Sequence, residues 1–251
     1  MNHVMYESYR KRRSFHKFPN CEKRISREDL AYLEEIFQSF TPWKKEWRYL
    51  WKIKDAGDQK NPINAEYYIS FYASSDPGCI EQIGYLMEEA ELLLIPRNIG
   101  VLFYGMGKEE VKQEDNLDFV IMMAIGKVDS SAFRYDQSSI KRKKLHEIYE
   151  GNRYLSVAQE VRYAPSAMNS QPWKIVEDGD VWKIYRVSRF GYLKAFTGNL
   201  IKMNRVDMGI FLKDVEVVLE EKGYEYERRF RFINEGVREL VAEYTISKEV
   251  E

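Results

Sequence analysis

The segment between Ala164 and Trp173 concentrates groups that could bind a ligand. It places small residues, hydroxyl groups and amides between two prolines, in the order Ala-Pro-Ser-Ala-Met-Asn-Ser-Gln-Pro-Trp. Small side chains let the backbone approach a ligand, and hydroxyls and amides both donate and accept hydrogen bonds. The prolines restrict the path of the chain, so these groups would be held in place. The segment predicts either a pre-formed binding loop or a rigid connection into a strand that begins at the core residue Trp173.

A run of cations near the N-terminus could bind an anion. The run is Arg12-Arg13-Ser14-Phe15-His16-Lys17-Phe18. Guanidinium groups with a neighbouring hydroxyl can hold a phosphate, whereas most basic runs of this kind are simply solvated. Both interpretations stay open on these residues alone.

Three glycines lie close together between Ile99 and Lys108. They could let the backbone pass close to a flat ring, or they could form a turn after a strand. The segment is not a phosphate-binding P-loop, because Met106 stands where that motif requires a lysine. No Gly-x-Gly-x-x-Gly pattern occurs in the chain, so the sequence predicts no Rossmann dinucleotide site.

The composition argues against several classes of protein. The 251 residues carry a formal net charge of −1, which gives no general attraction to nucleic acid or to a membrane surface. The two cysteines, Cys21 and Cys79, and the three scattered histidines predict neither a disulfide framework nor a metal site. No apolar run is long enough for a membrane span, and the N-terminus has no signal-peptide core. We therefore expect a cytoplasmic protein that holds no metal.

The pattern of apolar residues predicts alternating helices and strands around these segments. Residues 28–40 are amphipathic, and Ser26 is the expected N-cap of that helix. The other expected elements are helices over 82–94, 140–149 and 154–163, and strands over 47–53, 67–73 and 119–125. The helix over 140–149 would be basic, and Gly151-Asn152 would separate it from the next.

Short motifs from the first part of the chain recur in the second. The matched sets are Thr41-Pro42-Trp43-Lys44 with Gln171-Pro172-Trp173-Lys174, Trp51-Lys52-Ile53 with Trp182-Lys183-Ile184, and Gly84, Glu91 and Leu94 with Gly209, Glu216 and Leu219. Two copies of this length suggest a duplicated half, paired as the subunits of a two-fold dimer are. Matches this short also arise by chance. The duplication predicts a first half over 1–150 and a second half over 151–251.

Taken together, these segments resemble the nitroreductase family. Residues 12–18 are similar to its opening motif Arg-Arg-Ser-x-Arg-x-Phe, which grips the phosphate and ribityl chain of a flavin. Residues 165–173 resemble its Pro-Ser-x-x-Asn-x-Gln-Pro-Trp loop, which reaches the flavin from the partner subunit. Residues 99–107 resemble the segment beside the reactive edge of the isoalloxazine, and residues 123–126 resemble a late strand. The order of these motifs fits a branch with two half-like units fused in one chain.

The resemblance implies a nitroreductase-like α+β fold of two similar halves, each with a mainly antiparallel sheet flanked by helices. It also implies one FMN per chain, gripped by the first half and reached by the loop of the second. His16 and Ala167 depart from the family pattern, and the place around Thr41 to Trp43 lacks the serine and asparagine of that loop. The residues that would bind FMN are Arg12, Arg13, Ser14, His16, Tyr104, Gly105, Met106, Arg142, Pro165, Ser166, Ala167, Asn169 and Gln171.

The implied function is an oxidoreductase that passes hydride from NAD(P)H through the flavin to a nitroaromatic, quinone or similar flat acceptor. The residues show no catalytic acid–base pair, and this chemistry requires none. Two other functions stay open. One is a non-catalytic flavin-binding or sensing module, in which Phe103, Tyr104 and Phe190 fill the space above the ring. The other is a scaffold whose flavin sites have decayed. We expect a monomer built as a pseudo-dimer, with no nucleic-acid or membrane partner, and further self-association stays open.

Overall fold

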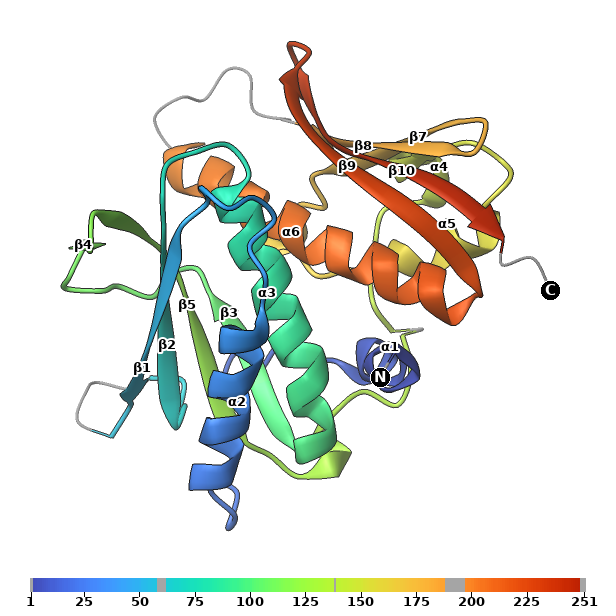
Figure 1. The fold of residues 1–251 in the computed structure, drawn as a ribbon. Helices are drawn as coiled ribbons and strands as arrows, with labels where there is room; N and C mark the ends of the chain where they lie inside the picture. The colour runs from blue at the N-terminus through green and yellow to red at the C-terminus, as the bar shows by residue number, and fades with distance from the viewer. Residues whose placement is uncertain (1, 58–61, 138, 188–196, 249–251) are drawn as a thin grey trace. The chain divides into compact units, whose positions relative to one another are not determined.

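The computed structural model describes residues 2–57, 62–137, 139–187 and 197–248. The chain divides into two compact units, residues 3–138 and 139–251. The boundary predicted after residue 150 therefore lies inside the second unit. Each unit contains one sheet and its own helices (Figure 1). Among the described residues, no helix is long and apolar enough to cross a membrane.

The first unit is built on an antiparallel sheet with the strand order β1-β2-β5-β3, to which β4 adds a short pairing with β5. Its elements are α1 (Asn2–Lys11), α2 (Arg27–Ser39), β1 (Tyr49–Asp55), β2 (Tyr67–Ala73), α3 (Cys79–Leu94), η1 (Ile95–Arg97), β3 (Ile99–Tyr104), β4 (Gln113–Glu114), β5 (Leu117–Lys127) and η2 (Ser130–Ala132). The expected helices and strands of this part are confirmed, with ends that move by a few residues.

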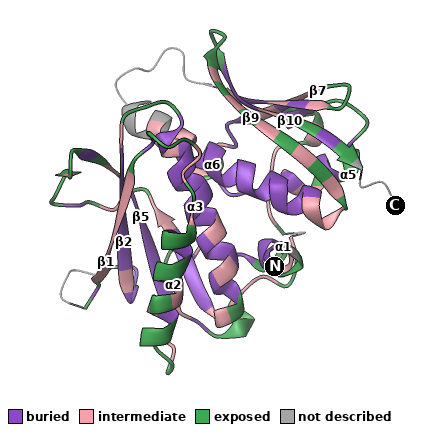
Figure 2. Ribbon diagram, in the orientation of Figure 1, coloured by how far each residue is buried: buried purple, intermediate pink, exposed green. Residues whose placement is uncertain are grey.

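Helix α2 begins as its sequence predicts. The Ser26 hydroxyl accepts the backbone N–H of Asp29, and the Asp29 carboxylate accepts the backbone N–H of Ser26, which forms a capping box. Leu33, Ile36 and Phe37 form the buried face, and the outer face is exposed (green in Figure 2). The Phe37 ring meets Phe71 of β2 at 5.4 Å, edge to face. The apolar stripe of α2 therefore covers one face of the sheet.

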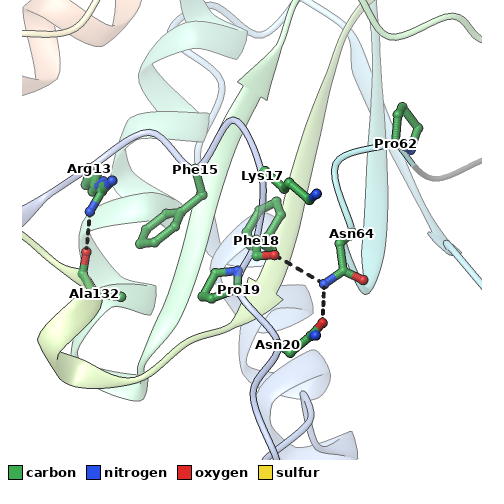
Figure 3. Close-up of a pocket in the computed structure, with 9 residues that line it drawn as sticks. All are labelled: Arg13, Phe15, Lys17, Phe18, Pro19, Asn20, Pro62, Asn64 and Ala132. Carbon is green, nitrogen blue, oxygen red and sulfur yellow. Dashed lines mark hydrogen bonds between the residues drawn. The ribbon is translucent and has the colours of Figure 1, made fainter.

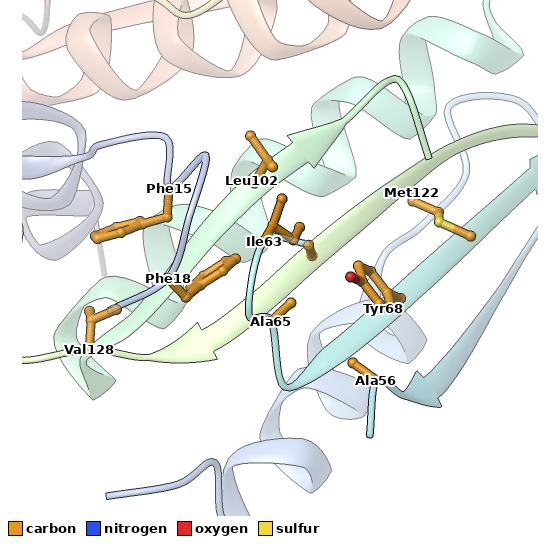
Figure 4. Close-up of a cluster of buried hydrophobic side chains, with 10 residues drawn as sticks. Phe15, Phe18, Ala56, Ile63, Ala65, Tyr68, Leu102, Met122 and Val128 are labelled. Carbon is orange, nitrogen blue, oxygen red and sulfur yellow. The ribbon is translucent and has the colours of Figure 1, made fainter. Parts of the chain in front are cut away.

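The other face of this sheet carries a cluster of aromatic and aliphatic side chains (Figure 4). Phe15 and Phe18 stack in this cluster with ring centroids 5.7 Å apart. They lie over two glycines, Gly100 of β3 and Gly126 of β5, which are cross-strand partners. A Cβ atom at Gly100 would lie 2.7 Å from the Phe15 ring, and one at Gly126 would lie 2.8 Å from the Phe18 ring. The cationic run is thus fixed to the sheet through its two aromatic residues.

The second unit repeats the same strand order. Its sheet runs β6-β7-β8-β10-β9, and every pairing except β6 with β7 is antiparallel. Its elements are α4 (Leu145–Ile148), β6 (Tyr149–Glu150), α5 (Leu155–Val161), η3 (Ala167–Asn169), β7 (Trp173–Asp178), β8 (Val181–Val187), α6 (Thr197–Glu221), β9 (Tyr224–Asn234) and β10 (Arg238–Lys248). Apart from the two-residue strands β4 and β6, two strands precede the long helix and two follow it in both units, with the same neighbours in the sheet. The expected pair of similar halves is confirmed at the level of topology.

Two sequence expectations are wrong in detail. The basic helix over 140–149 is reduced to Leu145–Ile148, because the residues before it are hydrogen-bonded to another loop, as described below. The match between Trp51 and Trp182 does not follow the duplication either. In the two sheets, β7 corresponds to β1 and β8 corresponds to β2. Trp51 lies on β1, whereas Trp182 lies on β8 and therefore on the strand that corresponds to β2.

Candidate functional site

Arg12 is an internal anchor of the first unit. Its side chain is buried, and its guanidinium donates to both carboxylate oxygens of Glu91 on α3, at 2.9 and 3.1 Å. Glu88 adds a second carboxylate 3.6 Å from Arg12 Nε. Burial raises the pKa of the Glu91 carboxyl, and the charge and hydrogen bonds of Arg12 act in the opposite direction. This pair joins the residue that follows α1 to the last turn of α3 and fixes where the cationic run begins.

The residues after Arg12 follow the edge of the sheet with their polar groups accessible. Ser14 forms a parallel bridge with Val101 of β3, and the Phe15 N–H donates to the Val101 carbonyl at 3.1 Å. The Ser14 hydroxyl lies 3.5 Å from Arg12 Nη2. Arg13 and His16 are exposed, and Arg13 donates to the Ala132 carbonyl at 3.3 Å. The segment is therefore held by its backbone and by Arg12, while its other cations face solvent.

Strand β3 ends in a tight turn at Gly105 and Met106. The Gly107 N–H donates to the Tyr104 carbonyl at 2.9 Å, and the Gly105 N–H donates to the Phe103 carbonyl at 3.1 Å. Met106 is 83% exposed, and its N–H has no acceptor in the part of the chain that the structure describes. The sequence allowed two interpretations of these glycines, a turn after a strand or a close approach to a flat ring. The structure has the turn, and the ring next to Gly100 is the side chain of Phe15.

The loop from Pro165 to Gln171 has an unusual backbone. Met168, Asn169 and Gln171 have φ values of 52°, 54° and 47°, in the left-handed region that residues with a Cβ adopt at a cost. Gln171 is buried, whereas Met168 is 90% exposed and Asn169 is also exposed. Inside the loop, the Ser166 hydroxyl accepts the Gln171 N–H at 2.9 Å. The loop is thus a rigid, strained structure that presents its tip to solvent.

Arg142 and Lys143 hold this loop. The Arg142 guanidinium donates to the carbonyls of Tyr163 and Ala164, both at 3.0 Å, and to the Asn169 side-chain oxygen at 2.9 Å. The Lys143 N–H donates to the Gln171 side-chain oxygen at 2.8 Å. These bonds need an extended backbone around Arg142, which explains why the basic run is not helical. They also mean that Arg142 acts on the loop itself.

Asp207 on α6 also holds this loop through hydrogen bonds. Asp207 is not among the site residues predicted from the sequence. Its carboxylate accepts the Ala167 N–H at 2.9 Å and lies 3.4 Å from the Ser170 hydroxyl, which also donates to Asn204 at 3.2 Å. Burial raises the pKa of Asp207 to about 8, and the two hydrogen bonds from the loop act against this rise. The sequence feature that could have identified it is an acidic residue between Val206 and Met208, in an otherwise apolar stretch of helix.

The predicted site residues therefore form two sets, each within one unit. The first set joins the cationic run to the β3 edge through Ser14 and Val101, and the turn at Met106 ends the same strand. The second set joins Arg142 to the loop of residues 165–171. Phe190, named in the sensing-module alternative, lies outside the described residues. That these residues bind FMN stays a prediction.

Comparison with known proteins identifies the family. The model of a family described as "Putative TM nitroreductase" matches residues 4–218. The chain belongs to this nitroreductase family. Among solved structures, the chain is similar to a putative nitroreductase from Thermotoga maritima, with 18% identity and a TM-score of 0.62 over 96% of this chain and 92% of that one. No curated protein matches the sequence.

Two further solved structures align with about half of this chain. A nitroreductase family protein from Clostridium novyi has 19% identity and a TM-score of 0.40, over 52% of this chain and 88% of that one. A putative NADH dehydrogenase/NAD(P)H nitroreductase from Parabacteroides distasonis has 10% identity and a TM-score of 0.43, over 59% and 98%. The nitroreductase-like α+β fold is thus confirmed, and family membership makes the chain an oxidoreductase at the level of class.

Proposed function

We propose that the chain binds one FMN and passes hydride from NAD(P)H to a nitroaromatic, quinone or similar flat acceptor, in the cytoplasm. Family membership supplies the reaction class. When bound, FMN supplies the ring that accepts and donates hydride, and the protein supplies binding, orientation and electrostatics. The proposal needs no catalytic acid or base from the chain.

The strained loop of residues 166–171 is the observation that carries this proposal. Three residues other than glycine are in the left-handed region, at a cost on the order of 1–3 kcal/mol each. This backbone persists because Arg142 and Asp207 hold it from both sides. Such strain concentrates at ligand sites, where the surrounding structure maintains it. Asn169 stays exposed although its amide accepts from Arg142 and donates to the Lys141 carbonyl. This exposed and ordered tip supports a binding role for Asn169, with Pro165, Ser166 and Ala167 shaping the backbone.

Some of the predicted residues have polar groups that are accessible to FMN, and others are bonded within the protein. We assign the first group to binding and the second to positioning. Arg13, Ser14 and His16 are accessible on a fixed backbone, so they suit a phosphate and ribityl hydroxyls. The free N–H of Met106 suits a ring nitrogen at the end of β3. The donors of Arg12 and Arg142 are directed to protein acceptors, and Gln171 is buried. We therefore assign these last three a positioning role.

A fluorescence titration with FMN tests the proposal. Wild-type protein should quench the flavin fluorescence, and Asn169→Ala should weaken binding about tenfold through loss of a hydrogen bond and of loop order. Asn152→Ala is the matched control, because Asn152 is exposed in the same unit and only its backbone N–H is bonded, to Glu177. Arg13→Ala should weaken binding by a similar factor from the first unit. Bound flavin should then lose its absorbance with NADH or NADPH under anaerobic conditions.

Two results would redirect the proposal. Bound FMN that neither nicotinamide can reduce would favour the non-catalytic flavin module. A wild-type chain that does not bind FMN at all would favour the scaffold, the alternative that the internal engagement of Arg12 and Arg142 supports.

A further inference from the structure

A pocket of about 650 Å³ opens on the first unit beside the cationic run (Figure 3). Its polar lining comes from Arg13, Lys17, Asn20 and Asn64, and its apolar lining includes Phe15 and Phe18. The volume lies in the range of small-ligand pockets. No residue of the pocket belongs to the loop of residues 165–171 or to the turn at Met106.

The pocket shares Arg13 with the surface proposed for the flavin, and it adds Lys17, Asn20 and Asn64, which the flavin assignment does not use. Arg12 Nη2 lies 3.5 Å from Ser14 Oγ, and neither of these two residues lines the pocket. The residues of the run that line it are Arg13, Phe15, Lys17 and Phe18. The same run therefore offers two surfaces that share Arg13.

The pocket is positively charged. Arg13 and Lys17 are exposed there, and none of the lining residues is acidic. Lys17 forms no ion pair or hydrogen bond with any residue that the structure describes. Arg134 donates to the Arg12 carbonyl nearby, and its pKa is lowered by burial and then by the positive charges of Arg12 and Arg13. No acidic residue that lines the pocket in the described part of the chain therefore neutralises the charges of Arg13 and Lys17.

Two amides complete the polar wall in fixed positions. The Asn64 side chain donates to the Phe18 carbonyl at 3.2 Å and to the Asn20 side-chain oxygen at 3.1 Å. Asn64 has a φ of 57°, a conformation that asparagine tolerates better than most residues. Because the Asn20 oxygen accepts, its amide nitrogen is left to donate into the pocket. Figure 3 shows this pair on the opposite side of the pocket from Arg13.

We infer that this pocket is a second anion site, which binds the phosphate monoester of a small ligand separately from the flavin. Lys17 and Arg13 supply charge, Asn20 supplies a neutral donor, and Phe15 and Phe18 supply an apolar floor for the body of the ligand. A phosphate dianion matches several convergent donors better than a carboxylate does. The phosphate could belong to a nucleotide, as a ribose 2′-phosphate does, or be inorganic.

Calorimetric titration of the full chain with adenosine 2′-monophosphate, adenosine and inorganic phosphate tests this inference. Adenosine 2′-monophosphate should bind and adenosine should not. Lys17→Ala should weaken the nucleotide about tenfold, with a smaller loss at high salt. Lys45→Ala is the control, because Lys45 is also exposed on the first unit and does not line the pocket. Inorganic phosphate that binds as tightly as the nucleotide would support the site and identify the free anion as its ligand.

Two outcomes would overturn the inference. One is the absence of binding by the wild type, or equal binding by wild type and Lys17→Ala. The other is an equal loss of FMN affinity in Lys17→Ala, which would make this pocket the flavin's own phosphate site. Phosphate binding in a chain that fails to bind FMN would leave the inference standing while the proposed function fails.

Discussion

The two long helices α3 and α6 occupy the same place in their units, and each binds a loop of its own unit through a different residue. Gln82 and Asp207 stand two residues before the matched glycines Gly84 and Gly209. Gln82 accepts the Trp43 N–H at 2.7 Å, and Asp207 accepts the Ala167 N–H at 2.9 Å. In both units, therefore, a side chain of the long helix binds the loop that precedes β1 or β7, which we call the entry loop of that unit.

The matched acids Glu91 and Glu216 extend this comparison. Both are buried, and each pairs with an arginine of its own unit, Arg12 or Arg228. Glu216 also accepts the Tyr244 hydroxyl at 2.8 Å. The helix positions are thus equivalent, but their partners come from the residue that follows α1 in the first unit and from the last two strands in the second. A duplicated framework has kept its polar positions while the entry loops have diverged, and only the second loop carries left-handed residues at its tip.

The largest expected difference between the units lies at the matched tryptophans. Trp173 is fully buried and stacks on Phe211 with centroids 4.5 Å apart, whereas Trp43 is half-buried against Tyr85. Trp173→Ala should cost about 3–5 kcal/mol of the free energy of unfolding through the cavity that it leaves. Trp43→Ala should cost about 1–2 kcal/mol. Urea denaturation followed by circular dichroism measures both free energies of unfolding. Equal losses in the two variants would contradict the prediction that Trp173 contributes more to stability than Trp43.

Arg142→Lys should loosen only the second entry loop. Lysine keeps the charge but cannot reach the Tyr163 and Ala164 carbonyls and the Asn169 amide at once, so the opening free energy of the loop should fall by about 2 kcal/mol. Hydrogen exchange of peptides that cover residues 163–171 reports this change. Arg153→Lys is the control, because Arg153 is exposed in the same unit and its ion pair with Asp180 is worth little. Unchanged exchange would show that the loop does not depend on Arg142.

Asp29 should make the first unit sensitive to acid. Burial alone raises the pKa of its carboxyl, but hydrogen bonds from Lys127, Ser26 and Arg97 outweigh this and lower the pKa to about 2. Its stabilisation, about 1–2 kcal/mol, is complete above the ordinary pKa near 4 and should be lost as the pH falls toward 2. Asp29→Asn should remove this part of the pH dependence. Denaturation curves between pH 2 and 5 that are parallel for both proteins would refute the assignment.

Asp207 should give the second unit the opposite dependence. Its pKa of about 8 lies above the ordinary value, so the folded chain binds a proton that the unfolded chain releases. The contribution to stability is complete below about pH 4 and is lost as the pH rises toward 8. A proton on Asp207 would let its Oδ2 donate to Ser170 while Ser170 donates to Asn204. The urea midpoint of the wild type should fall relative to that of Asp207→Asn, which does not titrate, as the pH rises across this range, and a constant difference would contradict the prediction.

Local patterns predicted the local structure of this chain well. The Ser26 cap follows from a serine three residues before an acid, and strand 67–73 follows from its aromatic and branched content. Contacts between distant residues were beyond the sequence. Arg12 looked free to bind phosphate because its partner Glu91 lies 79 residues away. The basic run around Arg142 looked helical because the loop that it holds is remote in the chain. The left-handed backbone of Met168 and Asn169 has no signature in residue type beyond the asparagine.

The paired glycines under Phe15 and Phe18 have a consequence for how this protein can be altered. Gly100 and Gly126 lie inside the sheet, and the space above them sets the distance of the two rings from the strands. A single methyl group at either position would displace a ring and, with it, the cations on either side. Substitution of either glycine should therefore change the affinity for anions from within the strands, through the rings and cations that it displaces.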